Sequence, residues 1–132
     1  MQPKIIYVED SPEDAELFSR NLERLGLNAE VIVLDDSQAL AYFDKLAAEN
    51  SFVPDVLVLD LKMPEQNGIT LLKAIKEIPH FDATPVVIFS GSMGPVEKAE
   101  ALRNGASLCI EKPHTPEDWE DVVTGITSFL AA

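Results

Sequence analysis

Cysteine is nearly absent from this sequence of 132 residues, which contains only Cys109. A single cysteine excludes an internal disulfide and a metal cluster built from several cysteines. Long apolar runs are missing too, because none approaches the ~18 residues that a membrane-spanning helix requires. The chain opens with Met1-Gln2-Pro3 rather than with a basic and apolar signal peptide. We therefore expect a cytoplasmic protein that does not interact with membranes.

Positive charge is also scarce, because ten Lys and Arg residues face 23 Asp and Glu residues. The resulting net charge of −13 repels the phosphates of nucleic acids, and no cluster of Lys and Arg offsets it. We therefore expect no nucleic-acid partner, whereas protein and cation partners fit this charge.

What the sequence does contain is a regular alternation of short apolar runs with helical segments. Residues 1–132 are enough for one compact domain with a hydrophobic core, since 46% of them are hydrophobic. The expected strands are rich in Val and Ile and apolar at successive positions, as in a parallel sheet that is buried on both faces. They are Lys4–Val8, Glu30–Leu34, Val56–Leu59, Val86–Phe89 and Leu108–Ile110.

Helix signals fill the intervals between these strands. Ser11-Pro12-Glu13-Asp14 combines an N-cap residue, a proline in the first turn and two acids that favour the positive end of a helix, and Gly26 suits its end. Further helices are expected at Ser37–Ala48, Gly68–Lys76, Pro95–Asn104 and Thr115–Leu130. Five strands alternating with five helices predict a doubly wound α/β sandwich, with right-handed crossovers and strand order 2-1-3-4-5.

Polar side chains follow four of the five expected strands. Glu9 and Asp10 come directly after the first strand, Asp60 after the third, Ser90 after the fourth and Lys112 after the fifth. An acid after an apolar strand is most often an ordinary loop residue. In open α/β sheets, however, binding sites form beyond the carboxyl ends of the strands, where these residues would meet. The coincidence across four strands therefore predicts a single site.

The composition of this cluster indicates phosphoryl chemistry. At a separation of ~4 Å and an effective dielectric constant of 20, each pair of carboxylates repels by about 4 kcal/mol. A hard cation such as Mg²⁺, which binds carboxylates, waters and phosphate oxygens, relieves this repulsion. A carboxylate is also a competent nucleophile toward phosphorus, and phosphoryl transfer depends mainly on positioning and charge neutralisation. Lys112 and the Ser90 hydroxyl could contribute to both.

Several short motifs occur in an order and spacing that resemble a known family, the CheY-like receiver domains of two-component response regulators, which have the flavodoxin-like (βα)5 fold. They cover essentially the whole chain and are Glu9-Asp10, Asp60-Leu61-Lys62-Met63-Pro64, Asn67-Gly68, Ser90-Gly91, Gly105-Ala106 and Lys112-Pro113. The chain also resembles the small regulators paired with bacterial phytochromes. The resemblance implies a stand-alone receiver over residues 1–132, without an output domain.

The resemblance also assigns roles to the site residues. It implies that Asp60 is the phosphoacceptor, and that Asp10, Asp60 and the backbone carbonyl of Lys62 ligate Mg²⁺. Glu9 would act through metal-bound water. Ser90 would turn toward the phosphoryl group and Lys112 would bind its oxygens. The Lys112–Pro113 peptide bond would be cis, as is typical of the family.

By the same resemblance, the chain is a signalling domain rather than an enzyme. Its partners would be a sensor histidine kinase, such as a phytochrome, and a downstream target or phosphotransfer protein. Many receivers pair through the fourth helix, fifth strand and fifth helix, so a homodimer through these elements is compatible with the resemblance, but the sequence leaves the oligomeric state open. One position departs from the pattern, because Cys109 stands where the family usually has Tyr or Phe. The sequence identifies neither the kinase nor the target, and it does not fix the phosphoryl lifetime.

Three other classes of protein share parts of this pattern. A P-loop ATPase also has an acidic residue after an apolar strand, but G-x-x-x-x-G-K-[ST] is absent from the sequence. A flavodoxin-like flavin binder would need a phosphate-binding loop where Glu9 and Asp10 stand. A haloacid-dehalogenase-type phosphatase would need a second Asp at the position of Lys62. A degenerate receiver that only binds proteins is a further alternative, which the complete set of acids, hydroxyl and lysine disfavours.

Overall fold

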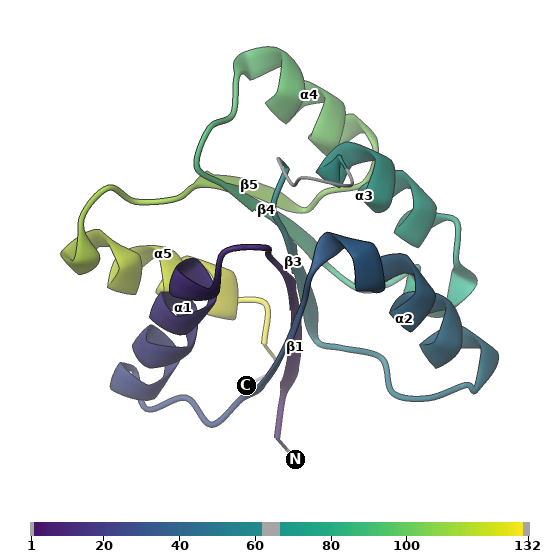
Figure 1. Ribbon diagram of the computed structural model, residues 1–132, viewed down its shortest axis with the longest axis horizontal. Helices are drawn as coiled ribbons and strands as arrows, with labels where there is room; N and C mark the ends of the chain where they lie inside the picture. Colours follow the sequence, from purple (N-terminus) through teal and green to yellow (C-terminus); the bar gives the residue numbers. More distant parts are fainter. Residues whose placement is uncertain (1, 62–66, 131–132) are drawn as a thin grey trace.

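The computed structural model describes residues 2–61 and 67–130 of the chain. Their framework is a five-stranded parallel sheet in the order β2-β1-β3-β4-β5, as the sequence predicts (Figure 1). The strands are β1 (Lys4–Val8), β2 (Glu30–Leu34), β3 (Val56–Leu59), β4 (Val86–Ser90) and β5 (Leu108–Glu111). The chain moves from β1 outward to β2 and then returns to β3 on the other side of β1, so the order reverses between β1 and β3.

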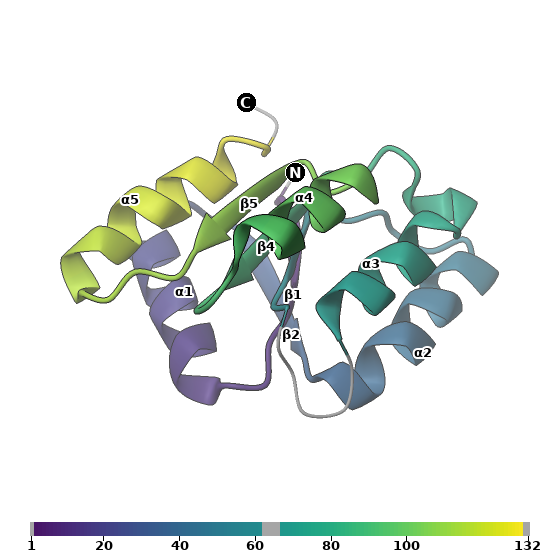
Figure 2. The ribbon, with the colours of Figure 1, turned by 90° about the horizontal axis from the view of Figure 1, so that it is seen from above.

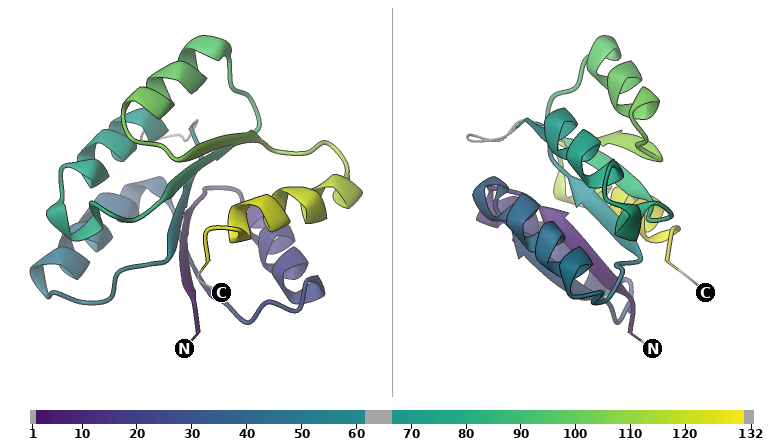
Figure 3. Two further views of the ribbon diagram at one scale, coloured as in Figure 1. Left: turned by 180° about the vertical axis from the view of Figure 1, so that it is seen from behind. Right: turned by 90° about the vertical axis from the view of Figure 1, so that its right-hand side faces the viewer.

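Helices cover both faces of the sheet. They are α1 (Pro12–Arg24), α2 (Asp36–Ala48), α3 (Gly68–Lys76), α4 (Pro95–Arg103) and α5 (Pro116–Thr127). Helices α1 and α5 pack together on one face, and α2, α3 and α4 form a row on the other (Figures 1 and 3). Within residues 2–61 and 67–130, no helix is both long and apolar enough to cross a membrane.

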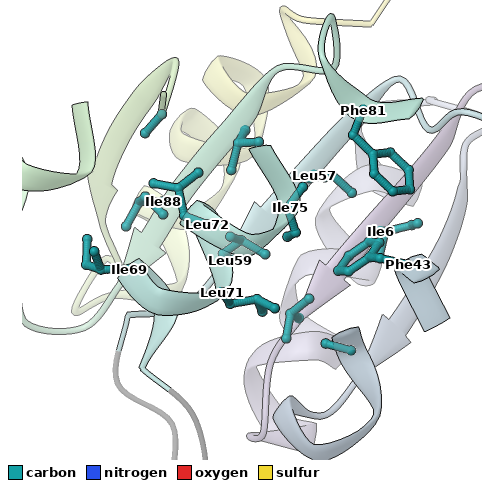
Figure 4. Close-up of a cluster of buried hydrophobic side chains, with 14 of the residues drawn as sticks. Ile6, Phe43, Leu57, Leu59, Ile69, Leu71, Leu72, Ile75, Phe81 and Ile88 are labelled. Carbon is teal, nitrogen blue, oxygen red and sulfur yellow. The ribbon is translucent and has the colours of Figure 1, made fainter. Parts of the chain in front are cut away.

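The alternation of side chains along the strands divides the core into two clusters, one on each face. In β1, Ile6 and Val8 belong to the cluster under α2 and α3, whereas Ile5 and Tyr7 belong to the cluster under α1 and α5. Figure 4 shows the first cluster, in which Phe43 of α2 lies near Ile6. Because a fully buried aliphatic or aromatic side chain contributes roughly 1.5–3 kcal/mol, the two clusters hold the strand ends in fixed positions.

The predicted elements agree closely with the observed ones. Strands β1, β2 and β3 have the predicted bounds, and β4 and β5 are each one residue longer. Helix α2 begins at Asp36 rather than at Ser37, because the Asp35 carboxylate accepts a hydrogen bond from the Gln38 backbone N–H and caps the helix one residue earlier. Helix α5 ends at Thr127 rather than at Leu130. A short 3₁₀ helix at residues 79–81 was not predicted.

Gly68 controls how closely α3 approaches the end of β3. Its backbone N–H donates a hydrogen bond to the carbonyl oxygen of Leu61 at 2.8 Å. A Cβ atom at this position would lie 2.2 Å from the carbonyl oxygen of Asp60 and 2.7 Å from the Cα of Leu61. Both contacts are with backbone, which cannot move aside without displacing Asp60.

The Gly68→Ala variant should therefore lower the free energy of unfolding by at least about 2 kcal/mol, in the range of severe steric mutations. Gly125→Ala is the matched control, because a Cβ there meets only the Ile110 Cδ1 atom, at 4.0 Å. Gly125 lies inside α5, so alanine should raise the free energy of unfolding by about 0.5–1 kcal/mol. Urea denaturation of both variants measures the difference. Equal stabilities would contradict the close approach at Gly68.

Candidate phosphoryl and metal site

The loops that leave β1, β4 and β5 lie at one end of the sheet, near the place where the strand order reverses between β1 and β3 (Figure 2). A cavity of about 330 Å³ opens there. It is lined by Glu9, Asp10, Ser11, Asp14, Asp60, Ser90, Gly91, Ser92 and Lys112. All side chains that the sequence pattern selects from the described residues therefore meet at one rim, as expected for an open α/β sheet.

Asp60 lines this cavity and is 5% exposed. Its backbone N–H donates to the carbonyl oxygen of Val8 at 3.2 Å, which fixes it at the end of β3 beside β1. The Ser90 hydroxyl donates to Asp60 Oδ1 at 2.9 Å, and Lys112 Nζ donates to Oδ2 at 3.0 Å. Each carboxylate oxygen thus has a donor from a different strand end, so the carboxylate is held in one orientation.

Glu9 is more buried than its sequence position suggests, with 3% of its surface exposed. The Tyr7 hydroxyl donates to Glu9 Oε1 at 2.8 Å, and the Ser11 backbone N–H donates to Oε2 at 3.2 Å. Lys112 Nζ lies 2.6 Å from Oε1. Burial raises the pKa of Glu9 from 4.5 to about 7, although hydrogen bonds from Lys112 and Tyr7 oppose this rise.

Three carboxylates form a group that could hold a metal ion. Glu9, Asp10 and Asp60 each offer an oxygen, and these oxygens all lie within 4.8 Å of one another. Asp10 is exposed, whereas Glu9 and Asp60 are buried, so the group opens toward solvent on one side. An all-oxygen donor set with an open side fits Mg²⁺, which retains waters and binds phosphate oxygens. Lys62, whose carbonyl was the remaining expected ligand, lies outside the described residues.

Lys112 connects the cluster. Its ammonium lies 2.6 Å from Glu9, 2.9 Å from Asp14 and 3.0 Å from Asp60. Burial alone would lower the pKa of Lys112, but hydrogen bonds to Glu9 and Asp14 outweigh it and raise the pKa above its ordinary value. The ammonium therefore stays charged at all physiological pH values.

The prediction of a cis peptide bond between Lys112 and Pro113 is wrong, because this bond is trans. The Lys112 backbone N–H donates to the carbonyl oxygen of Ser90 at 2.8 Å, which continues the sheet past the end of β5. From that anchor the long side chain reaches Asp60 without a cis bond. The trans form is also the lower in energy for an X–Pro bond, by about 0.5–1 kcal/mol.

Sequence reasoning missed two members of the site, Asp14 and Tyr7. Asp14 appears in the sequence as an acid that favours the start of α1, yet its carboxylate contacts an ammonium 98 residues away. Tyr7 lies in β1, and its hydroxyl is the only polar side-chain group between Lys4 and Glu9. That lone hydroxyl, two residues from Glu9 on the same face, is the signal that could have identified it.

Cys109 lies on β5, is 8% exposed and belongs to the buried cluster that also contains Ala101 of α4. Burial raises the pKa of the Cys109 thiol above its ordinary value, so a smaller fraction of it is the reactive thiolate at neutral pH. The structure thus places a small side chain beneath α4, at the position where the resemblance to receiver domains implies Tyr or Phe.

Comparison with known proteins supports the family resemblance. The model of the response regulator receiver domain matches residues 5–124. The chain is 31% identical to chemotaxis protein CheY1 of Helicobacter pylori over 114 residues, which cover 86% of this chain and 88% of that protein. It is also 31% identical to response regulator Rcp1 of Synechocystis over 130 residues, which cover 96% and 88% of the two chains.

Solved structures give the same result. The Mn²⁺-bound form of response regulator Rcp1 superimposes with a TM-score of 0.82 and 29% identity, covering 96% of this chain and 93% of that one. The phosphorylated cyanobacterial phytochrome response regulator RcpA superimposes with a TM-score of 0.86 and 26% identity, covering 98% and 94%.

The hydrogen bond from Tyr7 to Glu9 can be tested without any ligand. The Tyr7→Phe variant should raise the pKa of Glu9 further, because the charged carboxylate loses a buried donor, and should lower the free energy of unfolding by about 1.5 kcal/mol. A carboxyl NMR titration of Glu9 measures the pKa. Tyr42→Phe, which changes the other tyrosine of the chain, should leave the pKa unchanged. An unchanged Glu9 pKa in Tyr7→Phe would show that the hydroxyl does not stabilise the carboxylate.

Proposed function

The chain belongs to the response regulator receiver domain family, and on that premise we propose that it is a phosphorylation switch whose acceptor is Asp60. The observation that carries this proposal is the pair of donors on the Asp60 carboxylate, namely the Ser90 hydroxyl at 2.9 Å and the Lys112 ammonium at 3.0 Å. A carboxylate held in this way beside other acids is arranged for reaction with a phosphoryl group rather than for structural support.

In the proposed reaction, one oxygen of Asp60 forms a bond to the phosphorus of the donor. The bond between that phosphorus and the donor's leaving atom breaks, and its electrons leave with that atom. Lys112 and Ser90 would then donate hydrogen bonds to the transferred phosphoryl oxygens. Because Lys112 remains charged, it offsets part of the negative charge that the transfer brings into the cavity.

The same carboxylates would hold Mg²⁺, an ion that receiver domains of this family bind. Asp10, Asp60 and the backbone carbonyl of Lys62 would be its direct ligands, and Glu9 would contact it indirectly. When bound, Mg²⁺ supplies positive charge that neutralises phosphoryl oxygens. The separation of carboxylate oxygens, within 4.8 Å of one another, supports this assignment.

The phosphoryl donor would be a sensor histidine kinase of the phytochrome type. This part of the proposal rests on the similarity to RcpA, which is a phytochrome response regulator, and to Rcp1. The response would be a phosphorylation-dependent interaction with a downstream protein, with a phosphotransfer protein or with a second copy of the chain. Helix α4 exposes 79% of Val96 and 45% of Leu102, so an α4-β5-α5 interface in a homodimer would cover apolar surface.

Asp60→Asn should remove phosphoryl uptake from acetyl phosphate in the presence of Mg²⁺, because the amide keeps the shape of the carboxylate but lacks its nucleophilic oxygen. Intact-protein mass spectrometry measures the uptake. The control is Asp44→Asn, which removes an exposed carboxylate from α2 and should leave labelling at the wild-type level. Labelling of Asp60→Asn at the wild-type rate would contradict the assignment of the acceptor.

The output would be carried by the β4–α4 loop and α4 rather than by a rotating ring, since Cys109 is small. In the Cys109→Ala variant, beryllofluoride, which stands in for the phosphoryl group, is added with Mg²⁺. It should therefore shift the backbone amide resonances of Gly91–Gly94 and α4 as much as in the wild type. Two-dimensional NMR provides the measurement. If Cys109→Ala bound beryllofluoride but lost the shifts of α4, the thiol itself would be part of the response.

A further inference from the structure

Asp14 enters the phosphoryl site from α1, an element that contributes none of the acceptor or metal-binding residues. Its backbone N–H donates to the Ser11 hydroxyl at 3.3 Å, in the N-cap of the helix. Its carboxylate contacts Lys112 Nζ at 2.9 Å, and 28% of the side chain is exposed. The described carboxylates that could hold a metal ion together are those of Glu9, Asp10 and Asp60, and Asp14 is not among them. The contact of Asp14 in this site is with the Lys112 ammonium.

The Lys112 ammonium can donate only a limited number of hydrogen bonds. An ammonium group has three N–H donors and no acceptor. Three carboxylates lie within 3.0 Å of the Lys112 nitrogen, those of Glu9, Asp14 and Asp60. A phosphoryl group on Asp60 needs a hydrogen bond from the same nitrogen. Its oxygens must therefore share or replace one of the existing acceptors.

We propose that Asp14 is a positioning residue that holds Lys112 in the unphosphorylated state and thereby weakens the binding of a phosphoryl group at Asp60. This inference rests on the proposed function, because it concerns the same lysine and the same acceptor. Asp14 competes for the ammonium and also adds a negative charge beside the oxygens of the incoming group.

Two opposing effects of Asp14 must be compared. Its loss could let Lys112 swing away from Asp60, which would weaken phosphoryl binding, or it could free the ammonium for the phosphoryl group. Lys112 has other restraints: contacts with Glu9 and Asp60, a backbone hydrogen bond to Ser90 at 2.8 Å, and an ammonium 6.0 Å from the centre of the Phe89 ring. These restraints keep Lys112 in the site without Asp14, so the release of competition decides the outcome.

The expected gain is moderate. Exposed ion pairs contribute about 0.2–1 kcal/mol, and the pair here is more buried, because the exposed fraction of the Lys112 side chain is 11%. Asp14→Asn keeps the shape of the side chain and the start of α1 but removes the charge. It should therefore bind beryllofluoride about threefold to tenfold more tightly than the wild type.

The experiment is a beryllofluoride titration at saturating Mg²⁺, followed by the amide NMR signals of Ser90 and Gly91. Glu13→Gln is the matched control, because it removes the same charge from the same turn of α1 while Glu13 is exposed and is not an ion-pair partner of Lys112. Its affinity should equal that of the wild type. Asp14→Glu keeps the charge and should restore most of the wild-type affinity.

A second readout reports on Lys112 itself. The ¹⁵N resonance of the Lys112 ammonium should shift in Asp14→Asn and stay in place in Glu13→Gln. In a Lys112→Met background there is no ammonium to release. Asp14→Asn should then change the affinity for beryllofluoride no more than Glu13→Gln does. A purely structural role for Asp14 predicts weaker binding, so the direction of the change separates the two.

The outcomes distinguish this inference from the proposed function. If the wild type binds beryllofluoride but Asp14→Asn binds it equally or more weakly, the role of Asp14 is wrong and Asp60 remains the acceptor. If the wild type shows no Mg²⁺-dependent binding of beryllofluoride at all, the proposed function fails and the role of Asp14 fails with it.

Discussion

The contact between one ammonium and three carboxylates is the interaction on which this site depends. Lys112 follows β5, Glu9 follows β1, Asp60 follows β3, and Asp14 lies in the first turn of α1. Without the lysine, the acids would repel one another inside a partly buried cavity. The ammonium therefore joins elements that are distant in sequence, and any group that competes for it changes the whole cluster.

The sheet offsets the free-energy cost of this cluster of charges, because both of its faces are filled with apolar side chains that fix the strand ends. The buried polar groups at the rim each have identified partners, such as the Tyr7 hydroxyl on Glu9 and the Ser90 hydroxyl on Asp60. Burying carboxylates in this way opposes folding, as the raised pKa of Glu9 shows. The protein thus keeps a cluster of buried acids at the rim of the sheet at some cost to its stability.

The sequence predicts the residues whose positions follow from the strand period alone. Asp60, Ser90 and Lys112 stand where apolar runs end, and parallel strands bring such ends to one rim. Asp14 was not predicted as a site residue, because an acid is common in the first turn of a helix and its partner Lys112 is 98 residues away. The start of α2 was missed by one residue because both Asp35 and Ser37 are suitable N-cap types. Only the folded chain selects between such local alternatives.

The central claim is that Asp60 receives a phosphoryl group within this cluster, and borohydride trapping tests it most directly. The protein would be incubated with acetyl phosphate and Mg²⁺, reduced with sodium borohydride, which converts an aspartyl phosphate to homoserine, and sequenced by tandem mass spectrometry. We expect homoserine at position 60, and none when Mg²⁺ is removed with a chelator. Homoserine at another acidic position, or none in the presence of Mg²⁺, would contradict it.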